Sequence, residues 1–288
     1  MTTLHNLAGP PAGPDVLLES RQASLFESLR GLDSVIVALS GGADSAYLAW
    51  AAHTTLGARA LAVTALSASF SAFDREQCQA FVRHAGVRHE FIATEEFSNP
   101  LYVANAGDRC YHCKAELFEK LGGLAAERGV AAVAYGINAD DISDFRPGHR
   151  AAAEHRVLAP LLDAGMTKAA IRELSRRAGL PTWDRPASAC LSSRIPYGTA
   201  VTPEALGQVQ RAEAALRALG FRQLRVRHFG EEARVEFAAE ELAAALAPGT
   251  REQVESGLRA CGYRRITIDP RGYRQGSLNE ALASPRRA

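Results

Sequence analysis

The apolar run Val35–Leu39 is followed at once by the small polar segment Ser40–Ser45 (Ser-Gly-Gly-Ala-Asp-Ser) and then by a helix-forming stretch. This order predicts a buried strand that delivers a tight turn to the N-terminus of a helix. Unpaired backbone N–H groups and the helix dipole favour a bound phosphate at such a place. Gly41 and Gly42 let the backbone approach an anion that a Cβ atom would hold away. The segment therefore predicts an α/β fold with a phosphate site.

The side chains of this turn narrow the chemistry further. Ser40 and Ser45 add hydroxyl donors, and Asp44 is a carboxylate beside a polyphosphate, which implies a bridging divalent cation such as Mg²⁺. The Gly-Lys-Ser/Thr ending of a Walker P-loop is missing, which disfavours simple γ-phosphate hydrolysis. The turn resembles the pyrophosphate loop (PP-loop) of enzymes that cleave ATP between its α- and β-phosphates. A glycine-rich turn without a ligand is the alternative.

Between residue 34 and about residue 185, short apolar runs alternate with helical patterns, which is typical of a parallel α/β sheet with helices on both faces. Ligands of such sheets bind outside the carboxyl ends of the strands. Asn138, Asp140 and Asp141 follow one strand there, unless they form an Asx-rich turn that caps the next helix. Thr64, Ser67 and Ser69 lie at the carboxyl end of a second predicted strand. Asp144 and Arg146 extend the polar stretch that begins at Asn138. The predicted strands are 35–39, 60–65, 89–93, 130–136 and 157–159, and the predicted helices are 43–54, 74–84, 115–128 and 168–178.

Residues 186–200 have loop composition and separate two halves of the chain. Beyond them the expected order is helix, two strands, a helical region and a strand, which indicates a small two-layer α+β domain. Arg225 and Arg227 share one face of the first strand, and paired guanidiniums suit a phosphate or a carboxylate. A solvated face is the alternative, and Glu213 on the preceding helix is placed to orient one arginine. We expect domains at 16–186 and 201–288, with a helix at 203–219 and strands at 223–228, 233–237 and 265–269.

The chain has five cysteines, an odd and sparse set, and no export signal at its amino terminus, so we expect a reducing cytoplasm. Cys110 and Cys113 form a Cys-x2-Cys pair just before a predicted helix, and Cys190 offers a third thiol. Three converging thiolates would hold an iron–sulfur cluster with one iron left open. Burial of the pair as small apolar side chains is the alternative. Arg109 and Lys114 flank the pair, and positive neighbours would lower the pKa of the thiols.

Composition excludes some classes of protein. Of the 288 residues 47% are hydrophobic, yet no apolar run is long enough to span a membrane, and the formal net charge is only +1. We therefore expect a soluble protein without a membrane partner. The near-neutral charge also disfavours sequence-blind nucleic-acid binding.

Over residues 18–280 the chain resembles the LarE family. These are ATP-dependent sulfur transferases (sulfur insertases) of the PP-loop ATP pyrophosphatase superfamily, and they help to make the nickel-pincer nucleotide cofactor of lactate racemase. The Ser-Gly-Gly-Ala-Asp-Ser motif alone is shared with GMP synthase, NAD synthase and tRNA thiolases, whereas the conjunction of motifs is much more specific. The other motifs are 109–114 (Arg-Cys-Tyr-His-Cys-Lys), 136–148 (Gly-Ile-Asn-Ala-Asp-Asp-Ile-Ser-Asp-Phe-Arg-Pro-Gly), 186–198 (Pro-Ala-Ser-Ala-Cys-Leu-Ser-Ser-Arg-Ile-Pro-Tyr-Gly) and 225–228 (Arg-Val-Arg-His).

The resemblance implies a reaction in two steps. A carboxylate of pyridinium-3,5-biscarboxylic acid mononucleotide attacks the α-phosphate of ATP, which releases pyrophosphate and leaves an acyl-adenylate. Sulfur then replaces AMP and gives a thiocarboxylate. The physical logic agrees, because a carboxylate oxygen leaves poorly and an adenylate leaves well. The loop and its Mg²⁺ would stabilise the departing pyrophosphate.

The resemblance also implies roles for single residues. Cys190 matches the cysteine that, in single-cysteine members, surrenders its sulfur and becomes dehydroalanine. Cys110 and Cys113 add the pattern of a cluster-bearing subgroup, in which a [4Fe–4S] centre carries the extra sulfide, so both sulfur sources stay open. Lys114 would lie near the reacting phosphates or carboxylate, and family members assemble as homo-oligomers (hexamers). Arg225 and Arg227 would hold the substrate phosphate, with Arg194 and Glu213 in the same substrate site.

Three other functions remain to be separated from this one. A tRNA thiolase would use the same loop and cysteines, but it should carry an RNA-binding appendage and a basic face. An amide former similar to asparagine or GMP synthase needs an ammonia route and no cysteine triad. A nucleotide-sensing protein would keep the loop without chemistry. Pyrophosphate release with candidate acids separates these functions.

Overall fold

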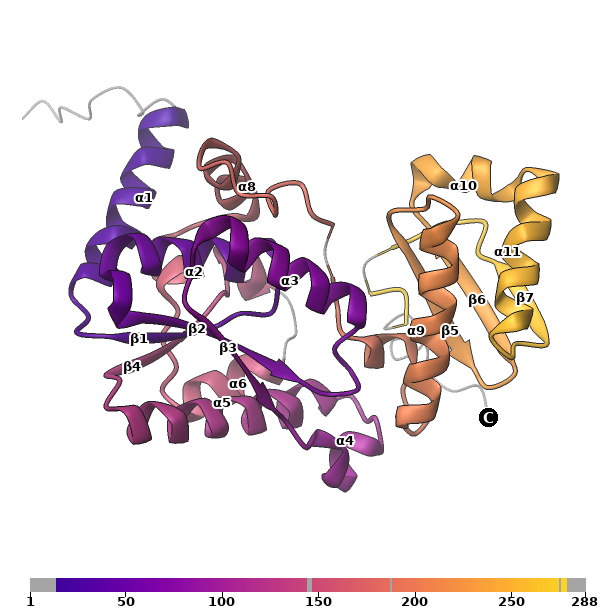
Figure 1. Cartoon of the computed structure of the whole chain (residues 1–288), viewed down its shortest axis with the longest axis horizontal. Coiled ribbons are helices and arrows are strands. Elements are labelled where there is room, and N and C mark those ends of the chain that lie inside the picture. The colour runs from indigo at the N-terminus through magenta and orange to yellow at the C-terminus, as the bar shows by residue number, and fades with distance from the viewer. Residues whose placement is uncertain (1–13, 144–146, 187, 275, 279–288) are drawn as a thin grey trace, which may run out of the picture.

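Two bodies joined by a connecting segment make up the protein, a computed structural model that describes residues 14–143, 147–186, 188–274 and 276–278 (Figure 1). The first body contains a four-stranded parallel sheet with the strand order β3-β2-β1-β4. The α/β prediction is thereby confirmed. Its elements are α1 (Pro14–Arg30), β1 (Val35–Ala38), α2 (Ala43–Leu56), η1 (Gly57–Arg59), β2 (Ala60–Leu66), α3 (Ala72–Ala85), β3 (His89–Ala93), η2 (Glu96–Ser98), α4 (Pro100–Val103), α5 (Arg109–Arg128), β4 (Ala132–Tyr135), η3 (Ala139–Ser143), α6 (Pro147–Glu154), α7 (Pro160–Asp163) and α8 (Lys168–Arg177).

Helices cover both faces of this sheet, and the alternation of side chains along β1 shows why. Val35 and Val37 pack into a core with α1, α2, α3 and α8, whereas Ile36 packs into a second core with α5 and α6. Successive side chains of a strand point to opposite faces, so a strand buried on both sides reads as a continuous apolar run. Figure 1 shows α2 and α3 on one side of the sheet and α5 and α6 on the other.

Two predicted elements of this body differ from the structure by more than a residue or two at an end. The stretch 157–159 is no strand, because its only ladder contact is a single bridge between Ala134 and Leu158. The helix expected at 115–128 begins at Arg109, so the Cys-x2-Cys pair lies on its first turns rather than before it. Cys, Tyr and His are weak helix formers, and packing of α5 against α4 and α6 overrides that propensity.

The second body contains a three-stranded sheet with the order β5-β6-β7, antiparallel between β5 and β6 and parallel between β6 and β7. The expected order of elements is present, with the helical region divided in two. Thr202 caps the first helix of this body, because its Oγ1 accepts a hydrogen bond from the Ala205 N–H at 3.2 Å. The elements are α9 (Pro203–Ala218), β5 (Leu224–Phe229), β6 (Glu232–Phe237), α10 (Ala239–Leu246), α11 (Pro248–Ala260) and β7 (Arg265–Ile268), and η4 (Leu191–Arg194) lies in the connecting segment.

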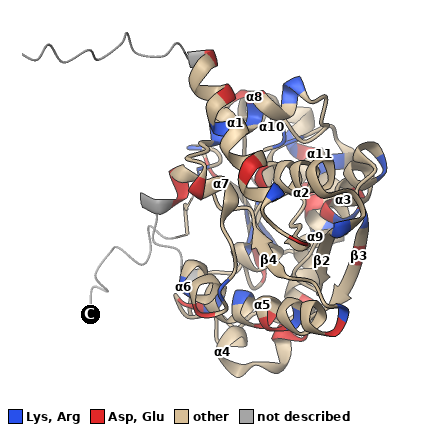
Figure 2. Cartoon of the chain, turned by 90° about the vertical axis from the view of Figure 1, so that its left-hand side faces the viewer, with Lys and Arg blue, Asp and Glu red and all other residues tan. Residues whose placement is uncertain are grey.

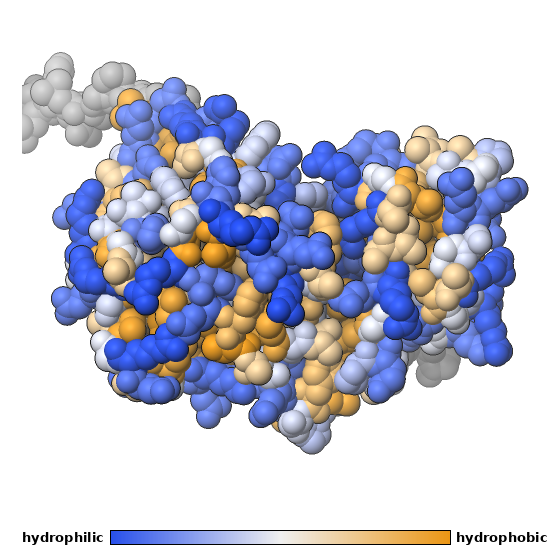
Figure 3. All heavy atoms as spheres, in the orientation of Figure 1, coloured by the Kyte–Doolittle hydropathy of each residue, from blue (hydrophilic) through white to orange (hydrophobic). Residues whose placement is uncertain are grey.

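The surface carries charged residues of both signs. Basic and acidic residues are interspersed along the helices of the first body (Figure 2). Hydrophilic residues cover most of the face in Figure 3, with apolar residues gathered in smaller patches. Within the described ranges, no helix combines the length and the apolar character needed to cross a bilayer.

Candidate active site

The phosphate loop lies where the order of the sheet changes direction. Strand β1 has β2 on one side and β4 on the other, so connections leave it toward both edges and open a crevice at its carboxyl end. Gly41 has a φ of 78°, a conformation that side chains rarely adopt. Gly42 is the N-cap of α2, so the N-cap residue supplies no side-chain hydrogen bond to the first N–H groups of the helix. The Ser45 hydroxyl accepts from the Ser40 N–H at 3.1 Å and donates to the Gly42 carbonyl at 3.2 Å, which closes the turn.

Gly136 is required for this arrangement, although the sequence analysis gave it no role of its own. A Cβ atom at this position would lie 2.7 Å from the backbone nitrogen of Ser45. The end of β4 therefore touches the first turn of α2, and a glycine permits the approach. A glycine at the last position of the predicted strand 130–136 was the available signal.

Asp44 and Asn138 meet across the crevice. The Asn138 side-chain amide donates to the Asp44 carboxylate at 3.0 Å, and Asn138 is fully buried. Burial raises the pKa of Asp44, and the negative charge of Asp141 acts in the same direction. Asp141 itself pairs with the Lys168 Nζ at 3.1 Å, while Asp140 accepts from the Lys168 backbone N–H at 2.8 Å. Asn138 thus contacts the phosphate loop directly, whereas Asp140 and Asp141 tie the loop after β4 to the start of α8.

A cavity of about 240 Å³ joins the residues that the sequence placed in separate motifs. Its wall includes the phosphate-loop hydroxyls, the ends of β1 and β2, one face of α5 and the segment before η4. The phosphate-loop hydroxyls and two of the three thiols, Cys113 and Cys190, therefore line the same cavity. The predicted site residues on this wall are Ser40, Ser45, Thr64, Ser67, Ser69, Cys113, Lys114 and Cys190.

Lys114 brings a positive charge to this cavity from the first part of α5. Its Nζ lies 5.2 Å from the centre of the Tyr135 ring, which is a cation–π contact. The stem of the side chain packs against Gly148 of α6, where a Cβ atom would collide with it. The contacts with Tyr135 and Gly148 hold the ammonium group at the carboxyl edge of the sheet.

The three cysteines lie close enough for each to affect another. Burial raises the pKa of Cys113 well above its ordinary value, with Glu96 and Cys190 as further causes. The Cys110 side chain is exposed, but desolvation by its neighbours and the charge of Cys190 still raise its pKa, and Arg109 only partly opposes this. The expectation that basic neighbours lower the pKa of the pair is therefore wrong, because desolvation outweighs them. In the part of the chain that the structure describes, no three His, Cys, Asp or Glu side chains are grouped so as to hold one metal ion.

Glu96 is a buried carboxylate of the cavity wall that the sequence analysis missed. It is 3% exposed, and a single oxygen, Oε1, accepts from the Ser67 and Ser69 hydroxyls at 2.6 and 2.7 Å. These serines are thus committed to a neighbouring side chain. Thr64 is committed as well, since its hydroxyl donates to the Leu39 carbonyl at 2.7 Å. Nothing in the local pattern around Glu96 distinguishes it from a surface glutamate.

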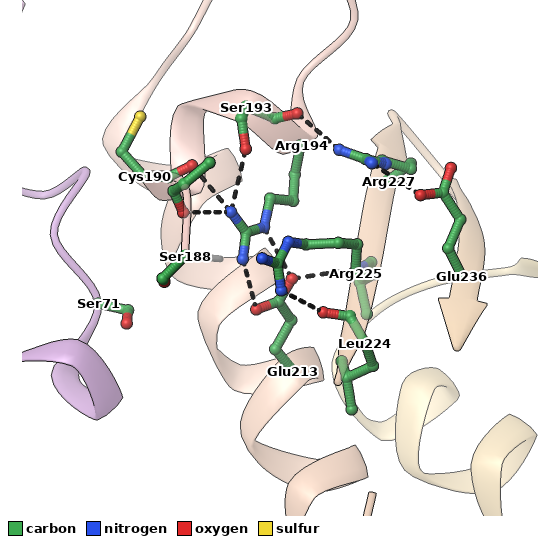
Figure 4. A network of polar contacts seen from close by, with 12 residues as sticks. Ser71, Ser188, Cys190, Ser193, Arg194, Glu213, Leu224, Arg225, Arg227 and Glu236 are labelled. Atoms are coloured by element: carbon green, nitrogen blue, oxygen red, sulfur yellow. Dashed lines mark hydrogen bonds and ion pairs between the residues drawn. The ribbon is translucent and has the colours of Figure 1, made fainter. Parts of the chain in front are cut away.

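Arg194 and Glu213 form a fully buried ion pair next to the segment of Cys190 (Figure 4). The guanidinium Nε and Nη2 donate to the two carboxylate oxygens at 2.8 and 3.0 Å, and each side chain is 2% exposed. Burial would raise the pKa of Glu213, but the charge and hydrogen bonds of Arg194 lower it to about 2. Arg194 also donates to the carbonyls of Ala189 and Cys190. Glu213 thus orients Arg194, which in turn fixes the backbone that carries Cys190.

Arg225 and Arg227 are both 5% exposed, so the alternative of a solvated face is wrong. Burial and the charge of Arg194 lower the pKa of Arg225 to about 10. Arg227 donates to Glu236 at 2.7 Å and to the Ser193 carbonyl at 2.9 Å. The two guanidiniums lie beside the Cys190 segment, as Figure 4 shows.

Arg185 is another residue that sequence reasoning missed. Its Nη1 donates to the Gly41 carbonyl, and its Nη2 donates to the Asp74 carboxylate at 2.6 Å. These partners are 144 and 111 positions away along the chain, so no local pattern reveals them. Asp144 and Arg146, which the sequence placed in the polar stretch after β4, lie outside the described residues.

A parallel sheet with a glycine-rich loop at its switch point and a cavity above it is the arrangement of a PP-loop α/β fold. No family model matches the chain. It is 33% identical over 266 residues to the pyridinium-3,5-bisthiocarboxylic acid mononucleotide synthase of Lactiplantibacillus plantarum, which covers 92% of this chain and 96% of that enzyme. The chain therefore belongs to the LarE family, as its motifs indicate.

Two relatives without a described function are also similar. An uncharacterized protein of Synechocystis sp. is 40% identical over 266 residues, which cover 92% of this chain and 99% of the relative. An uncharacterized protein of Methanocaldococcus jannaschii is 26% identical over 172 residues, which cover 60% of this chain and 66% of the relative. The cyanobacterial match extends over both bodies of the structure.

Proposed function

We propose that this protein is an ATP-dependent sulfur transferase that acts on pyridinium-3,5-biscarboxylic acid mononucleotide. It would adenylate one carboxylate and then replace AMP by sulfur to give a thiocarboxylate for nickel-pincer nucleotide synthesis. The relative named as pyridinium-3,5-bisthiocarboxylic acid mononucleotide synthase supports the substrate class. The observation that carries the proposal is the single cavity lined by the phosphate-loop hydroxyls, Lys114 and Cys190.

The adenylation half of the reaction is supported by the charges around the loop. The first turn of α2 offers backbone N–H groups to a polyphosphate. Asp44 fits a divalent cation, because its carboxylate is buried beside the negative Asp141 and a cation would offset both charges. A Mg²⁺ ion held by Asp44 would neutralise charge on the departing pyrophosphate. Lys114 stabilises the charge that develops on the reacting phosphate or carboxylate.

The sulfur-transfer half is supported by the placement of the cysteines. Cys113 and Cys190 line the same cavity, and Cys110 is their electrostatic neighbour. The thiolates of a [4Fe–4S] cluster bind to different irons, so they lie further apart than the ligands of one ion. Arg109, which is buried and donates to the Ser192 carbonyl at 2.8 Å, offsets their negative charge. We propose that the three thiols hold such a cluster, which would supply the transferred sulfide.

We propose that Arg225 and Arg227 together hold the substrate phosphate. Both guanidiniums are buried beside the segment that carries Cys190. Paired guanidiniums suit a phosphate dianion.

The experiment is pyrophosphate release from ATP and the biscarboxylate mononucleotide, followed by analysis of the product and of the protein. We expect Cys190→Ser to release pyrophosphate but to form no thiocarboxylate, because the thiol acts after adenylation. Cys261→Ser is the matched control, since Cys261 lies in the second body at the end of α11. Wild-type protein that releases no pyrophosphate with this acid would contradict the proposed function.

Two further measurements separate the sulfur sources. Anaerobic reconstitution should give a brown protein whose broad absorption is lost in Cys113→Ala, and a colourless wild type would argue against the cluster. The mass of the wild-type protein after turnover should be unchanged. Loss of the elements of hydrogen sulfide from Cys190 would instead identify this thiol as a sacrificed donor.

A further inference from the structure

Arg185 links two segments that the proposed reaction uses one after the other. Its guanidinium contacts the phosphate loop through the Gly41 carbonyl and contacts α3 through Asp74. The side chains of Arg185 and Asp74 are only 10% and 11% exposed. The contact is therefore a buried, charge-assisted bridge, which is stronger and better defined than a surface ion pair.

Asp74 passes this contact on to the segment that carries Cys190. The Ser188 hydroxyl donates at 2.9 Å to Oδ1 of Asp74, the same oxygen that accepts from Arg185. The other oxygen, Oδ2, accepts from the Ser71 hydroxyl at 2.5 Å. Both oxygens are thus occupied, so a displacement of Arg185 is transmitted to Ser188. Ser188 stands two residues before Cys190, and both residues line the cavity.

The charge at the phosphate loop changes during the proposed reaction. A bound triphosphate brings several negative charges next to Gly41, and departure of pyrophosphate removes them. Arg185 is the cation whose position responds to this change, because the guanidinium holds the loop itself and an oppositely charged partner behind it. Its planar fork of donors allows contacts with several acceptors at once.

We propose that Arg185 is a positioning residue that couples occupancy of the phosphate loop to the placement of the Ser188–Cys190 segment for sulfur transfer. This inference rests on the proposed function. It names a chain of contacts, Gly41 to Arg185 to Asp74 to Ser188, that connects the adenylation step to the sulfur-transfer step. If the network were merely structural, loss of its last link in Ser188→Ala would affect both steps alike.

The test measures the two half-reactions separately in the full-length protein. Exchange of labelled pyrophosphate into ATP, with the biscarboxylate mononucleotide present, reports adenylation. Single-turnover formation of the thiocarboxylate reports sulfur transfer. The variants are Ser188→Ala, Arg185→Gln and the double variant, and Arg222→Gln is the matched control. Arg222 pairs at 3.7 Å with Asp184, the residue just before Arg185. Its side chain is 77% exposed and is not among the contacts of the phosphate loop.

Ser188→Ala removes only the last link, so we expect pyrophosphate exchange within about twofold of wild type and sulfur transfer slowed about fivefold, the effect of one hydrogen bond. Arg185→Gln should slow both half-reactions. The double variant should transfer sulfur no more slowly than Arg185→Gln alone, because residues in one network are not additive. Arg222→Gln should match wild type in both assays.

Several outcomes would overturn the coupling. The coupling is refuted if Ser188→Ala slows the two half-reactions equally or slows neither. It is also refuted if the effects of the two substitutions add in the double variant. If Arg185→Gln does not fold, the split between half-reactions in Ser188→Ala decides alone. A wild type without pyrophosphate exchange would refute the proposed function itself, whereas normal exchange without the split refutes only the coupling.

Discussion

Replacing Glu213 by glutamine removes the counter-charge of a guanidinium that has almost no contact with water. Arg194 and Glu213 are each 2% exposed and share two hydrogen bonds of 2.8 and 3.0 Å. Glutamine keeps the size of the side chain and one oxygen, so the packing of α9 is preserved. The substitution therefore isolates the effect of charge on the free energy of unfolding.

The expected loss in the free energy of unfolding can be estimated in two independent ways. Removal of one member of a buried ion pair typically costs about 3–5 kcal/mol, because the other charge is left without compensation. The pKa of Glu213 falls from 4.5 to about 2 on folding. At about 1.4 kcal/mol for each tenfold change in proton affinity, this fall corresponds to about 3 kcal/mol. We expect Glu213→Gln to lose about 3 kcal/mol at pH 7.

The pH dependence has a definite sign. The folded state binds a proton on Glu213 less readily than the unfolded state, so the stabilisation is fully present above pH 4.5 and fades as the pH falls toward 2. The difference between wild type and Glu213→Gln should therefore shrink over this range. Urea unfolding followed by far-ultraviolet circular dichroism at pH 7, 5 and 3 measures it.

Glu255→Gln provides the matched control. Glu255 also pairs with two arginines, Arg251 and Arg259, but on the exposed surface of α11. Its replacement should leave unfolding indistinguishable from wild type. A loss below about 1 kcal/mol for Glu213→Gln at pH 7, or a difference that persists unchanged at pH 3, would refute the argument from burial.

Two other substitutions test the geometry of the site. Gly136→Ala places a Cβ atom 2.7 Å from the backbone of α2, so we expect a loss of about 1–3 kcal/mol and weaker ATP binding by calorimetry. Gly123→Ala, in open space on α5, should instead stabilise the protein by about 0.5–1 kcal/mol, and equal effects would contradict this account. Arg227→Met leaves the fully buried Glu236 without its 2.7 Å partner, so it should lose about 3 kcal/mol in thermal unfolding. Arg264→Met, which breaks only an exposed pair with Glu231, should lose less, and equal losses would contradict the argument from burial.

Local signals were sufficient for most of the first body. The continuous apolar run of β1 and the helical pattern of α8 are local signals, and both elements form as expected. The start of α5 was missed because its first turn has low helix propensity and is stabilised by tertiary packing. The stretch 157–159 has the composition of a strand, but it makes only one bridge to β4.

The same distinction between local motifs and distant contacts applies to the candidate site. The phosphate loop and the cysteine pair lie in short motifs, so sequence alone identified them. Burial of Arg225 and Arg227 depends on the neighbouring strand β6 and on the segment around Cys190, which are distant along the chain. Glu96 and Arg185 acquire their partners only through the fold. Spacing along a chain carries no information about such contacts.

The Arg194–Glu213 pair also determines whether the chain can be divided. Arg194 belongs to the segment that follows the phosphate-loop body, while its carboxylate comes from α9 of the second body. A fragment that stops before α9 would retain every phosphate-loop residue and yet leave the backbone around Cys190 without its anchor. The proposed nucleotide binding and the proposed sulfur transfer would then separate, so we expect such a fragment to bind ATP at most and to complete no turnover.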